Sequence, residues 1–258
     1  MLTRERQTII AERLAAHGKV LAGDLAIAFA VSEDTIRRDL REMAASGLCE
    51  RVYGGALARK PAPAAAPLAV RQEIDTPRKQ ALAAGATHLL DDGATIFIDV
   101  GSSNAALAAQ LPAERRYAIL THSPAIALSV SPRPHHQVTM FGGRYDAEVG
   151  ACLGAQTLAE IERLRPDILV LGACGLDAVA GVTAFDPEDA AIKRHLARSS
   201  ARILVLATTE KLGTSAPFAV AETSDVWHLV TEGSADNPVL DGFRDAGMAI
   251  TLAGQNRR

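Results

Sequence analysis

The chain has 258 residues, of which 48% are hydrophobic and 22% charged, with a formal net charge of −3. This is ordinary globular composition, and no stretch reaches the roughly 18 continuous apolar residues that a membrane span requires. The three cysteines, Cys49, Cys152 and Cys174, show no metal-ligand spacing and cannot all pair with one another. We therefore expect a soluble, non-exported protein of the reducing cytoplasm, without a metal or cofactor and without a membrane partner.

The charge is unevenly distributed along the chain. Residues 1–60 contain ten Lys/Arg against eight Asp/Glu, a net charge of +2, and residues 61–258 have a net charge of −5. This excess of cations is too small to establish nucleic-acid binding, but it falls on the segment whose motifs suggest it.

The first elements form a predicted helix-turn-helix. Residues 3–16 read as a helix, with Ile10 and Leu14 one turn apart and Gly18 as its stop signal. A short helix over 22–29 follows, and only two residues separate it from the next helix, which is the tight connection of a helix-turn-helix.

The third helix, residues 31–43, is expected to be the recognition helix. Ser32 can cap its first turn, and Ile36, Leu40 and Met43 form a narrow apolar seam at i, i+4 and i+7. Away from that seam lie three arginines whose forked cations suit phosphates and guanine edges: Arg37, Arg38 and Arg41. The alternative is an ordinary solvated helix with these arginines paired to nearby acidic residues: Asp34, Asp39 and Glu42.

A hairpin is predicted after this helix, which we expect to end at Gly47. Residues 48–52 alternate apolar and polar, Gly54-Gly55 supplies a two-residue turn, and Ala56-Leu57 begins the return strand. Three helices followed by such a wing form a small domain of the kind that places its last helix in the major groove.

Two motifs in residues 31–56 resemble the DNA-binding domain of the DeoR family of bacterial transcription regulators. The motifs are Val31-Ser32-x-x-Thr35-Ile36-Arg37-Arg38-Asp39-Leu40 and Arg51-Val52-Tyr53-Gly54-Gly55-Ala56. The resemblance implies an operator-binding surface in this domain, for which we expect these residues: Ser32, Glu33, Asp34, Thr35, Arg37, Arg38, Arg41, Arg51 and Tyr53.

A Pro/Ala-rich segment separates this domain from the rest. Pro61, Pro63 and Pro67 interrupt regular hydrogen bonding and favour an extended, semi-rigid spacer. We expect a DNA-binding domain at 1–58, a linker at 59–70 and a second domain at 71–258.

The second domain is predicted to be α/β with a mostly parallel sheet. Apolar runs of strand length alternate with helical stretches, which indicates a parallel sheet covered on both faces. The expected strands are 94–99, 117–121, 137–141, 167–172, 202–207, 226–231 and 248–252.

The loops at the ends of these strands carry the candidate ligand site, because open α/β sheets bind ligands there. Residues 99–104 join a strand to a helix N-terminus and could hold a phosphate, although N-capping by Ser102 or Ser103 would explain the serines equally well. His122 follows another strand, and it could have a structural role instead of contacting a ligand. Gly142-Gly143 could equally be a turn, and Glu188, Lys193 and Lys211 could be solvated charges.

Taken in order, these loops resemble the DeoR-family sensor domain, which is similar in fold to ribose-phosphate isomerase and the coenzyme A transferases and binds a phosphorylated sugar or polyol. The sequence departs from the family at Thr208-Thr209-Glu210-Lys211, where Asp-Ser-Ser-Lys is frequent, and at His122, where Asn is usual. The resemblance implies these effector-binding residues: Asp99, Gly101, Ser102, Ser103, Asn104, Thr121, His122, Ser123, Gly142, Gly143, Glu188 and Lys211.

We therefore predict a repressor of a sugar or polyol operon that binds double-stranded DNA as a homo-oligomer, a dimer or tetramer, and is released by a phosphorylated effector. The alternative is an active sugar-phosphate isomerase that carries a DNA-binding module. Such isomerases have an Asp-Gly-Ala-Asp string, whose counterpart here, Cys174-Gly175-Leu176-Asp177, lacks the first carboxylate, and we expect no catalytic residues. In a third interpretation the second domain only assembles oligomers and binds no small molecule.

Overall fold

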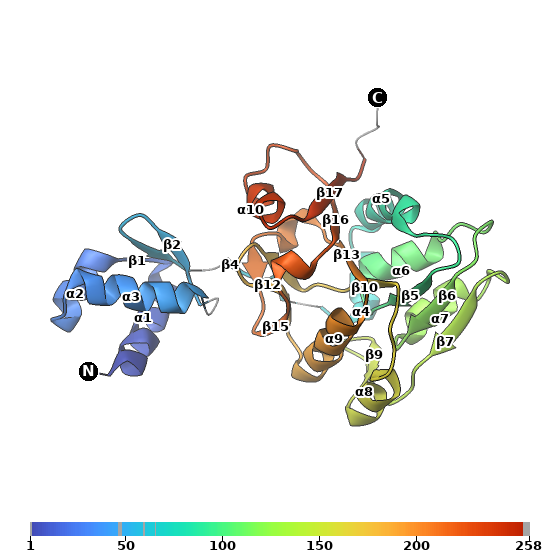
Figure 1. Cartoon of the computed structure of the whole chain (residues 1–258), viewed down its shortest axis with the longest axis horizontal. Helices are drawn as coiled ribbons and strands as arrows, with labels where there is room; N and C mark the ends of the chain where they lie inside the picture. The colour runs from blue at the N-terminus through green and yellow to red at the C-terminus, as the bar shows by residue number, and fades with distance from the viewer. Residues whose placement is uncertain (1, 46–47, 59, 65, 255–258) are drawn as a thin grey trace. The chain divides into compact units, whose positions relative to one another are not determined.

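The computed structural model describes residues 2–45, 48–58, 60–64 and 66–254. The chain divides into two compact units, Met1–Pro61 and Ala62–Arg258 (Figure 1). Gly47, the predicted end of the third helix, and Arg59, the predicted start of the linker, lie outside the described residues. The proposed limits of the linker therefore stay a prediction.

Within its described residues, the first unit has the three predicted helices and the predicted hairpin, and a strand that was not predicted, β1 (Lys19–Leu21), pairs with that hairpin. The three-stranded sheet has the order β1-β3-β2. The elements are α1 (Thr3–His17), β1 (Lys19–Leu21), α2 (Ala22–Phe29), α3 (Glu33–Ala45), β2 (Glu50–Val52), β3 (Gly55–Leu57) and β4 (Lys60–Pro61).

The predicted apolar seam of the third helix is confirmed. Ile36, Leu40 and Met43 of α3 are each at most 1% exposed and pack with Ile10 of α1 and Leu25 of α2. The backbone N–H of Thr35 donates to the Ser32 hydroxyl at 3.2 Å, so Ser32 caps this helix as expected. Burial of the seam fixes which face of α3 remains exposed.

The predicted hairpin is present, but its turn was placed one residue too late. Val52 pairs with Gly55, so the two-residue turn is Tyr53-Gly54 rather than Gly54-Gly55. Gly54 has φ +85°, a conformation that glycine adopts without strain. Gly55 instead lies within β3, where a Cβ would come within 2.0 Å of the carbonyl oxygen of Val20. The glycine pair therefore combines one turn residue with one residue that lets two strands approach.

The second unit is built on a seven-stranded sheet in the order β17-β16-β13-β10-β5-β6-β7. Neighbouring strands pair in parallel throughout this sheet. The predicted α/β class, the mostly parallel sheet and all the expected strands are thus confirmed. The strands are β5 (Thr95–Ile98), β6 (Ala118–Thr121), β7 (Gln137–Met140), β10 (Ile168–Leu171), β13 (Arg202–Leu206), β16 (His228–Thr231) and β17 (Ala249–Leu252).

Apolar side chains alternate between the two faces of this sheet and build one core on each. In β10, for example, Ile168 and Val170 contribute to one core, and Leu169 and Leu171 contribute to the other. Both sets are fully buried, which explains why the strands read as continuous apolar runs.

One core is covered by α5 (Thr76–Ala86), α6 (Ser102–Ala109) and α7 (Pro124–Val130). The opposite core is covered by α4 (Leu68–Glu73), α8 (Ala155–Ile161), α9 (Pro187–Ser199), α10 (Val239–Asp245) and a three-stranded sheet. That sheet has the order β11-β12-β15 and comprises β11 (Gly175–Asp177), β12 (Gly181–Ala184) and β15 (Phe218–Ala221).

The remaining elements are short. They are the hairpin of β8 (Arg144–Asp146) and β9 (Ala151–Leu153), β14 (Thr214–Ser215), and the 3₁₀ turns η1 (Thr87–Leu89), η2 (Thr209–Lys211) and η3 (Thr223–Asp225). Among the described residues, no helix has the length and apolar character needed to cross a membrane.

Candidate functional site

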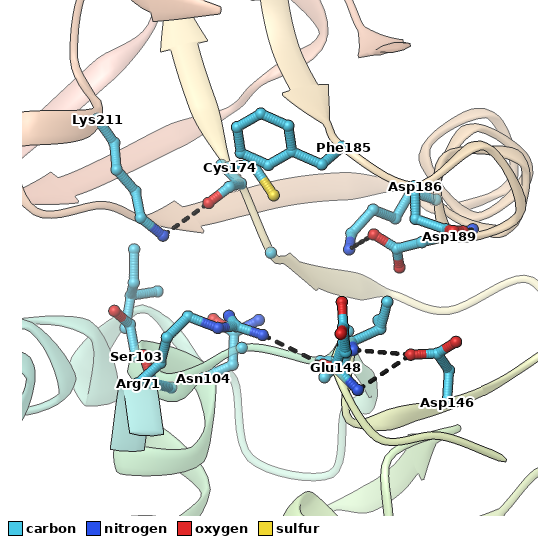
Figure 2. Close-up of a pocket in the computed structure, with 18 residues that line it drawn as sticks. Arg71, Ser103, Asn104, Asp146, Glu148, Cys174, Phe185, Asp186, Asp189 and Lys211 are labelled. Carbon is cyan, nitrogen blue, oxygen red and sulfur yellow. Dashed lines mark hydrogen bonds and ion pairs between the residues drawn. The ribbon is translucent and has the colours of Figure 1, made fainter. Parts of the chain in front are cut away.

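A cavity of about 270 Å³ opens where the strand order of the large sheet reverses (Figure 2). From β5 the chain adds β6 and β7 on one side, whereas β10, β13, β16 and β17 follow on the other side. The loops after β5 and β10 therefore diverge and leave a crevice at the carboxyl ends of these strands. Both loops line the cavity, through residues 100–104 and 172–174.

The N-terminus of α6 forms one wall of the cavity. Gly101, Ser102 and Ser103 line it, and both serines are buried. The N–H groups of the first turn of a helix have no partner within that helix, so this terminus can bind an anion. The side chain of Asn104 holds the loop in place, because its Nδ2 donates to the carbonyl oxygens of Asp99 at 2.9 Å and Val170 at 3.1 Å.

Two basic side chains face the same region. In Figure 2, Lys211 and Arg71 lie on the same side of the cavity as Ser103. Lys211 Nζ donates to the carbonyl oxygen of Ala173 at 2.7 Å, and burial lowers the pKa of Lys211 to about 8. Burial also lowers the pKa of Arg71, whose Nε donates to the carbonyl oxygen of Ala66 at 2.8 Å. An anionic ligand would relieve both of these desolvated cations.

Two lining residues, Asp189 and Lys193, belong to a buried cluster with Asp99 and His122. Lys193 Nζ lies 2.5 Å from Oδ2 of Asp189 and 3.4 Å from Oδ2 of Asp99. The other oxygen of Asp99 lies 2.9 Å from Nε2 of His122, whose Nδ1 lies 2.9 Å from the carbonyl oxygen of Cys152. All four side chains are at most 5% exposed.

Burial and neighbouring charges act in opposite directions within this cluster. For Asp99, burial opposes ionisation, but Lys193 and His122 outweigh it and lower the pKa. For Lys193, burial is outweighed by Asp189 and Asp99, which raise its pKa. Burial raises the pKa of Asp189, and Lys193 offsets only part of this effect. The ammonium of Lys193 is therefore held charged between two carboxyl groups.

The ligand atoms of Asp99, His122 and Asp189 lie within 4.8 Å of one another, which is compatible with metal binding. However, Lys193 already places a positive charge against both carboxyl groups. Its ammonium is already paired with the carboxyl groups that a divalent cation would need, so the arrangement favours an internal ion cluster over a metal centre.

The structure brings some of the predicted effector residues to the cavity. The predicted residues that line it are Gly101, Ser102, Ser103, Asn104 and Lys211. Asp99 and His122 are fully buried in the ion cluster, and the hydroxyl of Thr121 donates to the carbonyl oxygen of Ile98 at 2.7 Å.

Other predicted residues do not line the cavity. The hydroxyl of Ser123 donates to the carbonyl oxygen of Gly150 at 2.8 Å. Gly142 and Gly143 lie at the turn before β8, and a Cβ on Gly143 would come within 2.0 Å of Thr157 Oγ1. Glu188 is exposed and forms an ion pair with Arg144.

Sequence reasoning did not single out Asp189 or Arg71. Asp189 and Lys193 have the i, i+4 spacing that brings two helical side chains together, whereas sequence reasoning considered only Glu188 and Lys193 among the charges of this helix. No sequence motif marked Arg71 as a ligand-binding residue, because it lies directly after the predicted linker and far from the strand-end loops. Cys174, noted for replacing a carboxylate, lines the cavity.

In the first unit, two of the exposed arginines of α3 are paired with acidic side chains of the same helix. Arg37 pairs with Glu33 at 2.7 Å and with Asp34 at 3.4 Å, and Arg38 pairs with Glu42 at 3.2 Å. Exposed pairs of this kind contribute about 0.3–0.5 kcal/mol each, so a phosphate or base edge can replace the carboxylates.

The other predicted DNA-contacting positions are mostly exposed. Tyr53 is fully exposed at the tip of the hairpin, and Arg41 and Arg51 are also exposed. Ser32 and Thr35 share a hydrogen bond of 2.9 Å at the start of α3. Asp39, which the sequence offered as a possible partner for the exposed arginines, is instead buried against Arg6.

Comparison with known protein families identifies both units. Residues 6–62 match the model of the DeoR-like helix-turn-helix domain. Residues 74–233 match the model of the DeoR C-terminal sensor domain, which covers more than half of the chain. The chain belongs to the DeoR family. This DeoR-family protein is thus a DNA-binding transcriptional regulator with an N-terminal helix-turn-helix and a C-terminal sensor domain.

Curated relatives match it over almost their whole length. The putative aga operon transcriptional repressor of Escherichia coli O157:H7 is 25% identical over 98% of this chain and 95% of its own. The glycerol-3-phosphate regulon repressor of Escherichia coli K12 is 27% identical over 98% of this chain and 100% of its own. The regulator GolR of Listeria innocua is 26% identical over 98% and 100%. These relatives are named as transcriptional regulators, not as enzymes.

Likeness to solved structures is weaker. A transcriptional regulator from Streptococcus pneumoniae TIGR4 aligns with a TM-score of 0.41 and 13% identity, over 68% of this chain and 88% of that one. Ribose 5-phosphate isomerase A from Neisseria gonorrhoeae aligns with a TM-score of 0.39 and 13% identity, over 55% and 53%.

Proposed function

We propose that this DeoR-family protein represses genes for the uptake or breakdown of a sugar or polyol, and that a phosphorylated sugar or polyol in the cavity releases it from its operator. The observation that carries this proposal is the convergence of the α6 N-terminus with Lys211 and Arg71 on one cavity. Two cations beside a helix N-terminus provide both charge and hydrogen-bond donors for a phosphate dianion. The names of the relatives, among them the glycerol-3-phosphate regulon repressor, support the same class of effector.

On this proposal, Ser102 and Ser103 contact the phosphate with backbone N–H and hydroxyl groups. Lys211 and Arg71 supply the charge, and the exposed face of α3 contacts the operator. Because the two sites lie in different units, effector binding would lower DNA affinity by stabilising a conformation that binds the operator less well.

The proposal can be tested in two steps. Genomic fragments that the full-length protein retains identify the operator, and a thermal-shift screen of phosphorylated sugars and polyols identifies the effector. Gel-shift titration with the operator should then show weaker binding in the presence of the effector. A screen in which no phosphorylated compound raises the unfolding temperature or alters operator binding would overturn the proposal.

We further propose that the protein acts in the cytoplasm as a homo-oligomer, a dimer or tetramer. A single small winged unit buries too little DNA surface for strong specificity, and paired half-sites multiply it. Light scattering should give more than one chain per particle, and footprinting should show a repeated site. A monomer at working concentration that protects one unrepeated site would contradict this.

We also propose that the sensor unit has no isomerase activity. Cys174 lines the cavity at the position where the resemblance to sugar-phosphate isomerases expects a carboxylate. A thiol does not carry the constitutive charge of a carboxylate at neutral pH. Incubation with ribose 5-phosphate should give no ribulose 5-phosphate, and turnover by the purified protein would restore the enzyme alternative.

A further inference from the structure

The two sides of the cavity differ chemically. In Figure 2, Ser103, Lys211 and Arg71 lie on one side, and Asp189 and Asp186 lie on the other. The first side presents two cations and a helix N-terminus, whereas the second presents carboxyl groups, one of which is paired with Lys193, another lining residue. A ligand with an anionic phosphate at one end must therefore have a different group at its other end.

The carboxyl group of Asp189 is incompletely satisfied. Its Oδ2 accepts from Lys193 Nζ at 2.5 Å, whereas its Oδ1 has no hydrogen-bond partner within the described part of the chain. Asp189 is only 3% exposed, and it lines the cavity. A buried oxygen that lacks a partner costs free energy, and a donor supplied by a ligand in the adjoining cavity would remove that cost.

The position of Asp189 is fixed by its surroundings. Its backbone N–H donates to Oδ1 of Asp186 at 2.8 Å, which places Asp189 in the first turn of α9. The side chain is then held by Lys193 one turn later, while Lys193 is also held by Asp99. The unsatisfied oxygen therefore cannot turn away to find water without breaking a buried ion pair.

We propose that Oδ1 of Asp189 accepts a hydrogen bond from an effector hydroxyl at the end remote from the phosphate. The effector class is then a phosphorylated polyol or sugar with a free hydroxyl there, and phosphorylated sugar acids are excluded. A terminal carboxylate has no proton to donate to this oxygen, and a carboxylate left without a donor in a site with little water costs free energy. This inference rests on the proposed function, because it assumes that the phosphate occupies the α6 side.

Matched ligand pairs test the inference on the native, full-length protein. The pairs are glycerol 3-phosphate with 3-phosphoglycerate, erythritol 4-phosphate with 4-phosphoerythronate, and glucitol 6-phosphate with 6-phosphogluconate. Each pair keeps the phosphate and chain length and exchanges a terminal hydroxymethyl group for a carboxylate. Calorimetric titration should show at least one alcohol that binds, and its acid should bind roughly a hundredfold more weakly.

The variant Asp189→Asn gives an independent readout. An amide removes the negative charge and can donate to a carboxylate, so the affinity ratio of alcohol to acid should fall by about tenfold or more. Asp245→Asn makes the same chemical change at an exposed position on α10 and should leave the ratio unchanged. If Asp189→Asn does not fold, the ligand pairs on the native protein still decide the question.

The possible outcomes separate the two proposals. Equal binding of alcohol and acid within a pair, or binding of acids alone, would overturn the role of Asp189 while leaving a phosphate-binding sensor intact. Failure of all these phosphorylated compounds to bind, together with a negative screen of other sugar phosphates, would overturn the proposed function and this inference with it.

Discussion

Arg6 and Asp39, 33 residues apart in sequence, form a buried ion pair that links α1 to α3. Arg6 Nη2 lies 3.0 Å from Asp39 Oδ1, a second contact joins Nε to Oδ2, and the side chains are 7% and 2% exposed. Asp39 therefore belongs to the framework of the DNA-binding unit and is not available to the exposed arginines of its own helix. The pair fixes the orientation of the exposed face of α3.

Removing one partner of this pair should destabilise the first unit. Asp39→Ala leaves the Arg6 guanidinium buried without a counter-charge, and breaking a buried pair in this way costs about 3 kcal/mol or more. Chemical denaturation should show a lower midpoint for the helix-turn-helix unit and an unchanged transition for the sensor unit. An unfolding curve identical to that of the parent would show that the pair contributes nothing measurable.

Arg37→Ala and Arg38→Ala should each weaken operator binding while leaving effector binding unchanged, because these side chains are exposed on α3. If an arginine reads guanine, about 1–3 kcal/mol of base discrimination should disappear. If it contacts phosphate, affinity should fall for all DNA sequences and the salt slope should decrease by about one. Gel-shift titrations at several salt concentrations distinguish these cases, and unchanged affinity for both variants would argue against α3 as the recognition helix.

Ser102→Asp should abolish effector binding. The substitution places a carboxylate at the buried N-terminus of α6, where we propose that the phosphate binds, and repulsion between two anions at about 4 Å is worth roughly 4 kcal/mol near a protein surface. The operator should still be bound, so the variant should behave as a repressor that ignores inducer.

A second substitution controls for position. Glu188→Gln changes an exposed side chain paired with Arg144, and effector affinity should stay within about twofold of the parent, because surface changes are usually worth less than 0.5 kcal/mol. A folded Ser102→Asp protein that still responds to the effector would show that the phosphate binds elsewhere. A large loss of binding in Glu188→Gln would return Glu188 to the effector site.

Effector binding should weaken above pH 8. Burial lowers the pKa of Lys211 to about 8, so the free protein holds an ammonium below this pH and a neutral amine above it. The phosphate favours the ammonium and, with a second pKa near 6, is already a dianion at pH 7. Above pH 8 binding must therefore take up a proton, and Kd should rise toward tenfold per pH unit.

Calorimetry in buffers of different ionisation enthalpy measures this proton uptake directly. At pH 9 the native protein should bind close to one proton with the ligand, and at pH 7 almost none. Lys211→Gln should bind more weakly at neutral pH and lose the dependence. A native protein with constant affinity from pH 7 to pH 9 would place Lys211 away from the phosphate.

The large sheet was predictable because its signal is local. A central strand such as Ile168–Leu171 is a run of apolar side chains buried on both faces, and such a run can be recognised in the sequence, whereas the edge strand Gln137–Met140 is mostly exposed. The β8 and β9 hairpin was missed because Arg144–Asp146 is short and polar, and its pairing depends on a partner strand that follows a turn. The turn at Tyr53-Gly54 was misplaced because both glycines were assigned to the turn. Only Gly54 is a turn residue, whereas Gly55 lies in β3, where it allows close approach to Val20.

The cavity was only partly predictable, since a lining residue is defined by packing between distant segments. The α6 loop could be anticipated from a strand followed by glycine and serine residues. Arg71 could not be anticipated, because its place in the cavity depends on how α4 packs against the rest of the unit. Leu68 of α4 packs against Gly150, where a Cβ would lie 2.2 Å from Leu68 Cδ2. Asp189 was overlooked because sequence reasoning named its neighbour, Glu188. Adjacent residues of a helix point in directions about 100° apart, so only one of the two side chains can face the cavity.

The docking of α4 also determines how the two units are linked along the chain. Leu68 and Arg71 belong to the first helix after the DNA-binding unit, and Arg71 lines the cavity. If the effector binds Arg71 as proposed, a displacement of Arg71 acts on a main chain that reaches Pro61 within about ten residues, at most roughly 35 Å of extended polypeptide. The three prolines between Lys60 and Leu68 favour a semi-rigid segment, which absorbs less of such a displacement than a flexible linker would. The connecting peptide is thus short and proline-rich. We expect its length and composition to influence how strongly effector binding in one unit changes operator binding by the other.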